Sequence, residues 1–313
     1  MNEMAKKPII IDTDPGIDDA VALTLALFSE QYDVKLISTL AGNVSLENTF
    51  KNALKLTTFL KKQIKIVKGA SRPILNEPIS ASEIHGETGL DGFNFPMINY
   101  DLAIDGLATT RIHETIRESR QPVTLVGIGP LTDYAMFIRQ YPEDISKIER
   151  FVLMGGAIGR GNYGVLSEFN FAADPEAAKI VFESGVDIYL APLEVGQKAK
   201  VTPDLSNKIK DLGMVGEMLY SLFSHYRGGS LKTGLRIYDA LAIAILEKPE
   251  LFTFDKTYIE IETSGKFTAG ASLMDFKNYL GKKPNAKVAI DIDVAMFSEW
   301  LLSKLQMINE SLR

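Results

Sequence analysis

The amino-acid sequence predicts an α/β fold in which helices cover both faces of a mostly parallel central sheet. Short apolar runs rich in β-branched residues alternate with helical apolar patterns from the first residues onward. The composition, 46% hydrophobic and 24% charged over 313 residues, is that of an ordinary globular protein. Because no linker, repeat or low-complexity segment interrupts this alternation, we expect one domain that spans residues 1–313.

The strands are predicted from apolar runs of strand length, and the helices from apolar residues that recur every three to four positions. Strands are expected at Pro8–Asp12, Val34–Leu40, Ile64–Val67, Val123–Ile128, Phe151–Met154 and Val186–Leu190. Helices are expected at Ile17–Gln31, Leu46–Leu60, Asp105–Glu118, Leu131–Gln140 and Pro175–Ser184. After residue 257 the pattern changes to the strand-like segments TYIEIE and AKVAIDIDV, and a final amphipathic helix runs to about Met307.

Two segments depart from this alternation and are expected to be functional loops. Residues 71–101 are rich in Gly, Pro, Asn and acidic residues, and residues 224–237 read SHYRGGSLKTGLRI between two helical segments. Long loops in compact domains tend to be functional or disordered, so we interpret the second segment as a mobile lid. Ligands of parallel sheets bind beyond the carboxyl ends of the strands, where such loops lie.

The composition also excludes several kinds of protein. Cysteine is absent, which excludes disulfides and thiolate zinc sites. The net charge is −6 and Lys and Arg do not cluster, so we expect no nucleic-acid partner. The apolar run in the N-terminal MNEMAKKPIIIDTD is too short for a signal peptide, and no segment approaches 18 consecutive apolar residues. We therefore expect a cytoplasmic protein with no membrane partner.

Four carboxylates lie within eight residues at the end of the first predicted strand: Asp12, Asp14, Asp18 and Asp19. A purely structural interpretation explains part of this cluster, since Asp14 can cap a helix whose first position is Pro15. It does not explain four acids, which repel one another when they are crowded. A hard divalent cation resolves this repulsion, because calcium and magnesium bind carboxylate and carbonyl oxygens. The cluster therefore predicts a metal site.

The segment D-T-D-P-G-I-D-D-A at residues 12–20 resembles the N-terminal signature of the inosine–uridine-preferring nucleoside hydrolase family. Further segments that match the family follow in the same order along nearly the whole chain: Ala41-Gly42-Asn43, His85-Gly86-Glu87-Thr88-Gly89-Leu90, Gly129-Pro130-Leu131-Thr132, Met154-Gly155-Gly156-Ala157, Gly161-Asn162, Glu168-Phe169-Asn170, Asp174-Pro175-Glu176-Ala177-Ala178 and Asp239-Ala240. The resemblance implies the open α/β fold of that family, a nucleoside substrate, and a homodimer or homotetramer.

The resemblance also implies a calcium-dependent N-ribohydrolase that releases ribose and a free purine or pyrimidine base. Its calcium ligands would be Asp14, Asp19, Asp239 and the carbonyl of Ile128, and Asp14 would be the general base that deprotonates a metal-held water. The positions that match ribose-binding residues are Asp18, Asn43, Met154, Asn162, Glu168, Asn170 and Asp239. His85 belongs to the loop that flanks the leaving base and, with Tyr238, is a further candidate catalytic residue.

These residue types suit the reaction, which passes through an oxocarbenium-like sugar. A cation and a carboxylate activate water, and amides and carboxylates hold the ribose hydroxyls. The structural alternative for Glu168 and Asn170 is a solvated strand with alternating polar side chains, which places both residues on one face. Each polar residue also has an ordinary structural interpretation, for example Asn162 as a Gly-Asn turn residue. The order of the matching segments favours the functional interpretation.

The sequence departs from the family before the late aspartate, where many members carry a histidine and this chain has Tyr238. A phenol with an ordinary pKa of about 10 is a poorer proton donor near pH 7 than an imidazolium. We therefore expect Tyr238 to stack on the base. The candidates that could compensate are His225, Tyr226, Arg227 and Arg236. We interpret His113 as a surface residue and Trp300 as part of the final helix.

Two other functions are weighed against this one. Asp12-Thr13-Asp14 at a strand end is also typical of haloacid-dehalogenase-like phosphatases, although a phosphate-binding lysine and a later acidic motif are not recognisable. A ribose- or nucleoside-binding protein without turnover is the second alternative, suggested by Tyr238. The glycines between Gly156 and Gly161 have the wrong order for a dinucleotide-binding loop.

Overall fold

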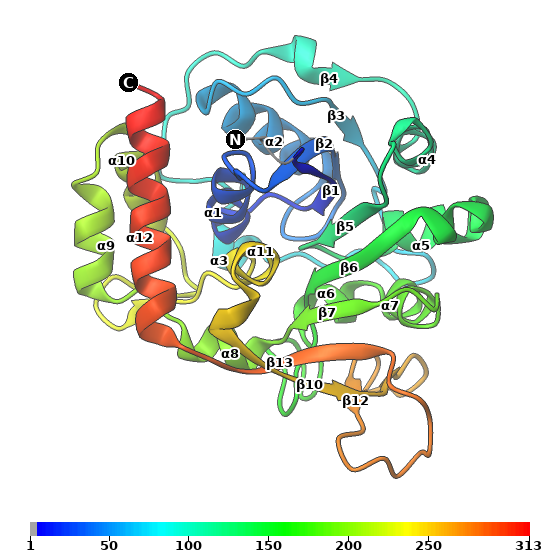
Figure 1. Ribbon diagram of the computed structural model, residues 1–313. Helices are drawn as coiled ribbons and strands as arrows, with labels where there is room; N and C mark the ends of the chain where they lie inside the picture. The colour runs from blue at the N-terminus through cyan, green and yellow to red at the C-terminus, as the bar shows by residue number, and fades with distance from the viewer. Residues whose placement is uncertain (1–4) are drawn as a thin grey trace.

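A nine-stranded sheet runs through the middle of the computed structural model, which describes residues 5–313 (Figure 1). Its strands lie in the order β10-β13-β7-β6-β5-β1-β2-β3-β4. They are β1 Lys7–Thr13, β2 Tyr32–Thr39, β3 Ile66–Lys68, β4 Ala103–Ile104, β5 Val123–Gly127, β6 Ile148–Met154, β7 Ile188–Ala191, β10 Phe252–Thr257 and β13 Ala286–Ile292. The edge strand β10 pairs antiparallel with β13, and the other neighbours pair parallel. The predicted mostly parallel α/β sheet is confirmed.

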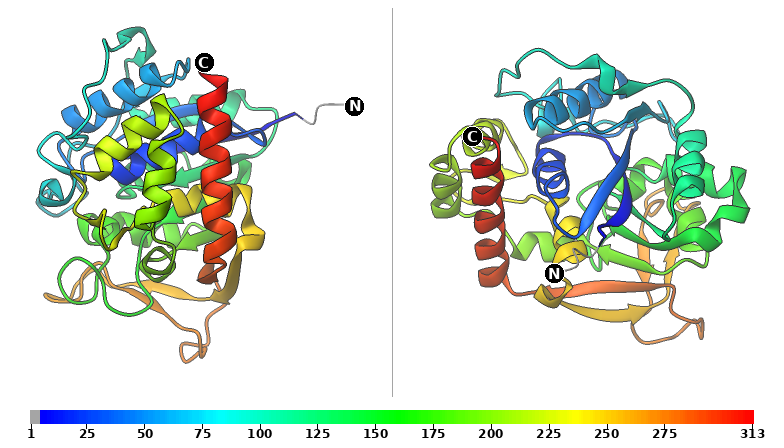
Figure 2. Two further views of the ribbon diagram at one scale, coloured as in Figure 1. Left: turned by 90° about the vertical axis from the view of Figure 1, so that its left-hand side faces the viewer. Right: turned by 45° about the horizontal axis from the view of Figure 1, so that its top comes forward.

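Helices cover both faces of the sheet because its central strands are apolar on both sides. In β1, Ile9 and Ile11 face one hydrophobic core and Ile10 the other, and all three are fully buried. The helices of the first face are α1 Ile17–Ala26, α2 Leu46–Phe59, α8 Leu193–Lys198, α9 Pro203–Lys210, α10 Met214–Phe223, α11 Ala240–Glu247 and α12 Val294–Ser311. Those of the second are α4 Ala108–Glu118, α5 Thr132–Gln140 and α7 Pro175–Phe182. Figure 2 shows α9, α10 and α12 side by side on the first face.

Shorter elements join the ends of the strands. They are the helices α3 Ser82–His85 and α6 Phe169–Ala173, the ribbon β8 Gly229–Ser230 with β9 Gly234–Leu235, and the ribbon β11 Ile259–Ile261 with β12 Ser272–Met274. Single 3₁₀ turns lie at Tyr100–Leu102, Pro142–Lys147 and Pro249–Leu251. The two predicted functional loops therefore contain local structure: α3 within residues 71–101, and the β8–β9 ribbon within residues 224–237.

The strand order reverses between β1 and β5. From β1 the chain adds β2 and β3 on one side, and from β5 it adds β6 and β7 on the other. In open parallel sheets such a reversal leaves a crevice at the carboxyl ends of the two central strands, because the following loops diverge. The acidic segment after β1 and the turn after β5 both open into this crevice.

Several predicted boundaries were wrong in detail. The helix expected to reach Gln31 ends at Ala26, because the Ser29 hydroxyl accepts the amides of Gln31 and Tyr32 and turns the chain into β2. The short elements β4, α8 and α9 were not predicted. The final helix extends past Met307 to Ser311.

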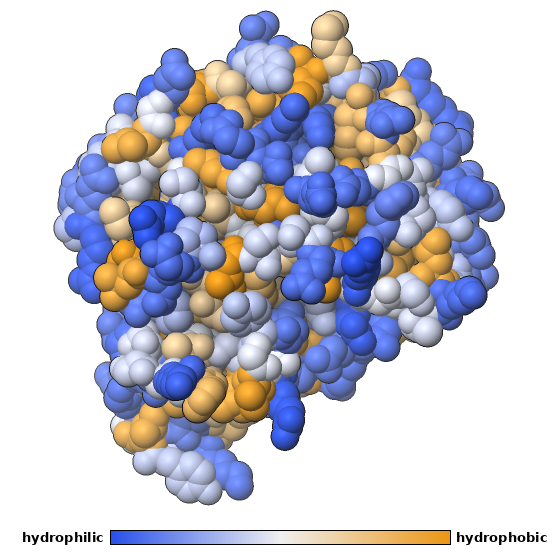
Figure 3. Space-filling model, turned by 180° about the vertical axis from the view of Figure 1, so that it is seen from behind, coloured by the Kyte–Doolittle hydropathy of each residue, from blue (hydrophilic) through white to orange (hydrophobic). Residues whose placement is uncertain are grey.

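The outer surface mixes hydrophilic and apolar side chains on the face seen in Figure 3. Between residues 5 and 313, none of the helices has the combination of length and apolar character that a bilayer crossing needs. The first four residues, which belong to the segment considered as a signal peptide, lie outside the described part of the chain.

Candidate active site

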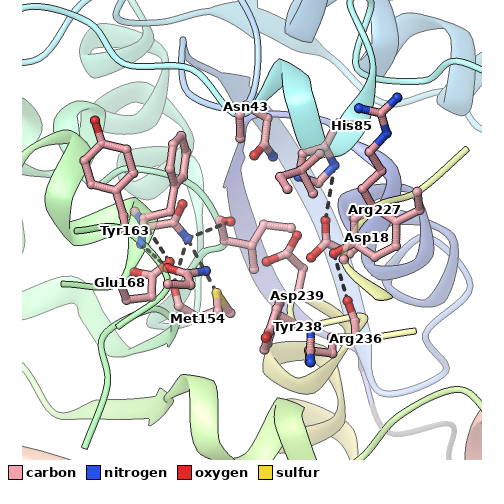
Figure 4. Close-up of a pocket in the computed structure, with 18 of the residues that line it drawn as sticks. Asp18, Asn43, His85, Met154, Tyr163, Glu168, Arg227, Arg236, Tyr238 and Asp239 are labelled. Atoms are coloured by element: carbon pink, nitrogen blue, oxygen red, sulfur yellow. Dashed lines mark hydrogen bonds and ion pairs between the residues drawn. The ribbon is translucent and has the colours of Figure 1, made fainter. Parts of the chain in front are cut away.

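A cavity of about 340 Å³ opens at the carboxyl ends of the strands (Figure 4). The sequence-predicted residues that line it are Asp18, Asn43, His85, Ile128, Met154, Asn162, Glu168, Asn170, Tyr238 and Asp239. The other two, Asp14 and Asp19, are fully buried beside it. The fold thus brings together all twelve residues predicted for the site, from segments up to 225 positions apart (Asp14 to Asp239).

The acidic side chains converge at the floor of the cavity. Carboxylate oxygens of Asp18, Asp19 and Asp239 lie within 4.8 Å of one another, with α1 supplying the first two and the N-terminus of α11 the third. Asp14, at the end of β1, is close enough to this group that its charge raises the pKa of Asp239. This group includes Asp18, which the resemblance assigns to the sugar and not to the metal.

Asp14 lies in a cradle formed by two glycines. A Cβ atom on Gly42 would lie 2.1 Å from Asp14 Oδ2, and one on Gly129 would lie 2.5 Å from Oδ1. The backbone amide of Asn43 donates to Oδ2 at 2.6 Å, whereas Oδ1 has no hydrogen-bond partner among the described residues. The carboxylate is therefore held firmly while one of its oxygens stays available.

Asp19 is oriented by its own loop. The Thr13 hydroxyl donates to Oδ1 at 2.6 Å, and the amide of Gly16 donates to Oδ2 at 2.9 Å. The side-chain amide of Asn43 donates to Asp19 Oδ2 at 3.1 Å and to the carbonyl of Asp14 at 3.2 Å. Asn43, predicted to bind ribose, thus uses both amide hydrogens to position the acidic segment.

The buried carboxylates repel one another strongly. Burial and the neighbouring charge of Asp19 raise the pKa of Asp18 to about 8. Burial and the charges of Asp18 and Asp19 likewise raise the pKa values of Asp14 and Asp239 well above their ordinary range. Oδ1 of Asp18, like Oδ1 of Asp14, is buried without a hydrogen-bond donor in the described chain. Unpaired buried carboxylate oxygens in a cluster are the donor set that a hard divalent cation fits.

The opposite wall is organised by Asn170. Its side-chain amide donates to the carbonyls of Ile128 at 3.3 Å and Met154 at 3.2 Å, and it lies 3.5 Å from the Met154 sulfur. These contacts join the loops after β5 and β6 to α6. The Ile128 carbonyl, predicted as a metal ligand, therefore borders the cavity next to a predicted sugar-binding amide.

Glu168 and Asn170 do not lie on a strand, which was the ordinary structural interpretation of their alternation. Glu168 is the N-cap of α6, and its carboxylate accepts the amides of Asn170, Phe171 and Gly156 at 2.9, 3.2 and 3.0 Å. The segment Glu168–Asn170 reads like a strand, but these local bonds favour a helix start. Burial raises the pKa of Glu168 to about 7.

His85 is fixed as a neutral imidazole. Its Nδ1 accepts the amide of Ile17 at 3.0 Å and lies 3.8 Å from Asp18 Oδ1. Burial lowers the pKa of His85 to about 3. Because Nδ1 is an acceptor, the proton is on Nε2, so His85 can donate a hydrogen bond as a neutral ring but is not an imidazolium acid.

The lid segment closes one side of the cavity. The amide of Arg227 donates to the carbonyl of Ile84 at 3.0 Å, and the hydroxyl of Tyr226 donates to the carbonyl of Arg236 at 2.8 Å. Tyr226, Arg227 and Arg236 line the cavity together with Tyr238. Burial raises the pKa of Tyr238 to about 12, which makes the phenol a still weaker acid than expected.

Three other predicted side chains lie away from the cavity. His225 is exposed, and its ring contacts the hydroxyl of Ser224. His113 was predicted to be a surface residue, but it is half-buried and stacks on Tyr141, with ring centroids 4.0 Å apart. Trp300 packs beside Phe297 in α12, so it offers no platform for a base.

The sequence did not reveal every residue of the site. Tyr163 and Phe169 line the cavity as an edge-to-face pair with centroids 5.9 Å apart. The Ser272 hydroxyl, on β12, bonds both the amide and the carbonyl of Ala157 at 2.9 Å and so fixes the loop after β6. Tyr163 and Phe169 are neighbours of predicted residues and were detectable from that spacing, whereas Ser272 is far away in the chain.

Taken together, the fold and the site define an α/β protein whose buried carboxylates border a cavity of about 340 Å³ at a topological switch point. Residues 9–299 match the family model of the inosine-uridine preferring nucleoside hydrolases. The chain is 45% identical to the non-specific ribonucleoside hydrolase RihC of Shigella boydii over 96% of this chain and 98% of that protein. It is also 45% identical to the RihC of Salmonella typhi over 94% and 95% of the two chains.

Solved structures agree. A purine-preferring ribonucleoside hydrolase from Gardnerella vaginalis superposes with a TM-score of 0.90 at 27% identity, covering 97% of this chain and 100% of that one. A plant nucleoside hydrolase superposes with a TM-score of 0.88 at 27% identity, covering 96% of this chain and 99% of that one. The chain belongs to the inosine–uridine preferring nucleoside hydrolase family. This membership confirms the resemblance and the enzyme class, nucleoside N-ribohydrolase, that were predicted from the sequence.

Proposed function

We propose that this protein hydrolyses the N-glycosidic bond of ribonucleosides in a calcium-dependent reaction in which Asp14 is the general base. The observation that carries the proposal is the convergence of Asp14, Asp18, Asp19 and Asp239 beside a cavity whose lining includes the side-chain amides predicted to bind the sugar. Purine and pyrimidine nucleosides are both proposed substrates, in keeping with the names of the RihC relatives.

Calcium would be held by the carboxylates of Asp14, Asp19 and Asp239 and by the carbonyl of Ile128, with Asp18 beside them. The donor set supports this assignment, since these ligands are all oxygen atoms and two of the neighbouring carboxylate oxygens lack hydrogen-bond donors in the described chain. When bound, the ion would supply the positive charge that lowers the pKa of a water molecule.

The protein residues would then do three things. Asp14, held in its glycine cradle with Oδ1 available, accepts a proton from the attacking water. Asp18, Asn162 and Asn170 bind the ribose hydroxyls. His85 and Tyr238 flank the departing base, and the lid and aromatic walls exclude water from the cavity.

The phosphatase alternative finds no support in the site. Asp12, the nucleophile that it requires, accepts the hydroxyl of Ser38, and its strongest charged neighbour is Asp133 and not one of the acids at the floor of the cavity. The lining residues of the described chain include no lysine that could hold a phosphate. Family membership points the same way.

The test is a panel of inosine, adenosine, uridine and cytidine in which ribose and free base are both quantified. We expect stoichiometric release of both products, loss of activity with a chelator, and recovery with calcium. Saturable, calcium-dependent nucleoside binding without products would instead favour the binding-protein alternative. Phosphate release from an aryl phosphate with no ribose release would favour the phosphatase.

Three further predictions from the sequence form part of this proposal: a single domain over residues 1–313, a homodimer or homotetramer, and a cytoplasmic location. A single cooperative unfolding transition supports the first, and light scattering on the purified protein measures the second. Fractionation of cells that express the protein tests the third.

A further inference from the structure

Tyr238 is held tightly against a helix beside the cavity. A Cβ atom on Gly196, in α8, would lie 2.2 Å from Tyr238 Cδ1, so the ring packs directly against the backbone of that helix. The side chain is half-buried, and phenols as a class are weak acids near neutral pH. Tyr238, at the position where many family members have a histidine, therefore contributes an apolar wall. Another group must stabilise the negative charge of the leaving base.

Arg236 lies beside it and has the charge that Tyr238 lacks. It lines the same cavity as Tyr238. Figure 4 shows the two side chains next to each other, near Asp239.

The backbone of Arg236 is fixed whereas its side chain is not paired. Its amide donates to the carbonyl of Gly228 at 3.0 Å, and its carbonyl accepts the Tyr226 hydroxyl at 2.8 Å. Its Nε is buried without an acceptor, and no carboxylate of residues 5–313 lies within 4.0 Å of its guanidinium. Arg227, the other arginine of the cavity, is exposed and donates to the carbonyl of Glu83. A buried donor without a partner costs free energy unless a ligand satisfies it.

We propose that Arg236 is a catalytic residue that stabilises the negative charge on the departing base, in place of a protonating acid. The inference rests on the proposed nucleoside hydrolysis. The C1′–N bond breaks and its electron pair leaves with the base, while the water oxygen bonds to C1′ and the water proton passes to Asp14. The base anion, paired with the guanidinium, then takes a proton from solvent, and Asp14 releases one. The products are ribose and the neutral base.

A permanent cation suits every base. A general acid has to reach the ring nitrogen that it protonates, and the position of that nitrogen differs between purines and pyrimidines. A guanidinium can pair with any anionic ring. Leaving-group activation by Arg236 is therefore expected to act on purine and pyrimidine nucleosides alike.

The test compares two kinds of leaving group in the calcium-loaded enzyme. Hypoxanthine from inosine and uracil from uridine are poor anionic leaving groups, whereas 4-nitrophenyl β-D-ribofuranoside releases a stabilised phenolate that needs little assistance. Arg236→Met should lower kcat for both nucleosides by roughly 10²–10³-fold, as loss of an electrostatic donor does. The same variant should change kcat for the nitrophenyl riboside by less than about threefold, because that step makes little use of the guanidinium. Arg236→Lys keeps the positive charge but loses the planar guanidinium. It should hydrolyse nucleosides about tenfold faster than Arg236→Met does.

Arg227→Met is the matched control, because it removes the same charge from the rim of the same cavity. We expect it to change the rates for all three substrates by one common factor. An equal loss on nucleosides and on the nitrophenyl riboside in Arg236→Met would overturn the inference, as would unchanged nucleoside hydrolysis. If Arg236→Met does not fold, Arg236→Gln carries the same comparison. A wild-type enzyme that cleaves the nitrophenyl riboside in a calcium-dependent way but no nucleoside would instead refute the proposed function.

Discussion

The substitution Gly42→Ala probes the position of Asp14 without touching a charged group. The new Cβ would lie 2.1 Å from Asp14 Oδ2, 2.8 Å from its Cγ and 3.0 Å from Pro130 Cδ. Ordinary contact begins near 3.4 Å, so the carboxylate must move by about 1 Å or the backbone must yield. Pro130 and the Gly129 cradle restrict movement away from the methyl group.

A displacement of about 1 Å at a reacting group costs about 100-fold in rate, or about 2.7 kcal/mol in the barrier. We therefore expect kcat/KM for inosine to fall by about two orders of magnitude and calcium affinity to weaken. Overpacking should also lower the free energy of unfolding by about 1–3 kcal/mol. The assays are steady-state hydrolysis at saturating calcium, calcium titration, and thermal unfolding.

Gly159→Ala is the control for this substitution. It adds the same methyl group in the loop after β6, at a residue without a positive φ, where the nearest atom would be Glu194 Oε1 at 3.7 Å. We expect its activity to remain close to that of the wild type. If Gly42→Ala kept both its activity and its calcium affinity within about threefold of wild type, the tight cradle and its role in placing Asp14 would be wrong.

Asp14→Asn should fold normally and lose at least about 10³-fold in kcat, since the general base is removed; near-normal turnover would refute its role. Tyr238→His should raise kcat on purine nucleosides if protonation of the leaving base limits the reaction. An unchanged kcat would mean that another group protonates or stabilises the leaving base. Lys304→Met should lower the free energy of unfolding by about 3–5 kcal/mol because it leaves Glu247 charged and buried; denaturant unfolding measures this, and a companion Glu247→Met substitution should restore most of the loss. His85 stays neutral in the folded protein, with its pKa lowered to about 3 from 6.5, so unfolding binds a proton in this window and stability should fall as the pH drops from 6.5 toward 3. At fixed calcium, the melting temperature of His85→Asn should depend less steeply on pH than that of the wild type. The same dependence in both proteins would contradict the lowered pKa of His85.

The sequence was sufficient to predict the sheet and most of the site because those features depend on local patterns. Continuous apolar runs identify strands buried on both faces, and β1 with its Ile9–Ile11 run is an example. The acidic segment after it carries its own signature, and the loops that follow parallel strands meet at one edge of the sheet. The resemblance to the family implied that Asp14 and Ile128 lie together, and the direction of the parallel strands explains why the fold brings both to this edge.

Features that depend on competition between local bonds or on distant contacts were not predictable. The segment Glu168–Asn170 alternates like a strand, but the carboxylate of Glu168 captures three amides and starts a helix. Ser272 contacts Ala157 across 115 positions, and no spacing in the sequence indicates that pair. The packing of Tyr238 against Gly196 likewise depends on how α8 meets the lid, which no periodicity encodes.

Calorimetric titration of calcium into chelator-treated protein, with Asp239→Asn as the comparison, tests the central claim most directly. Asp239 is the proposed ligand most distant in sequence from Asp14 and Asp19, and its carboxylate lies within 4.8 Å of those of Asp18 and Asp19. We predict saturable binding at one site per chain in the wild type, restoration of nucleoside hydrolysis in step with that binding, and loss of both in a folded Asp239→Asn. Full hydrolysis in excess chelator, or unchanged calcium binding in Asp239→Asn, would contradict the proposal that these carboxylates form one metal site.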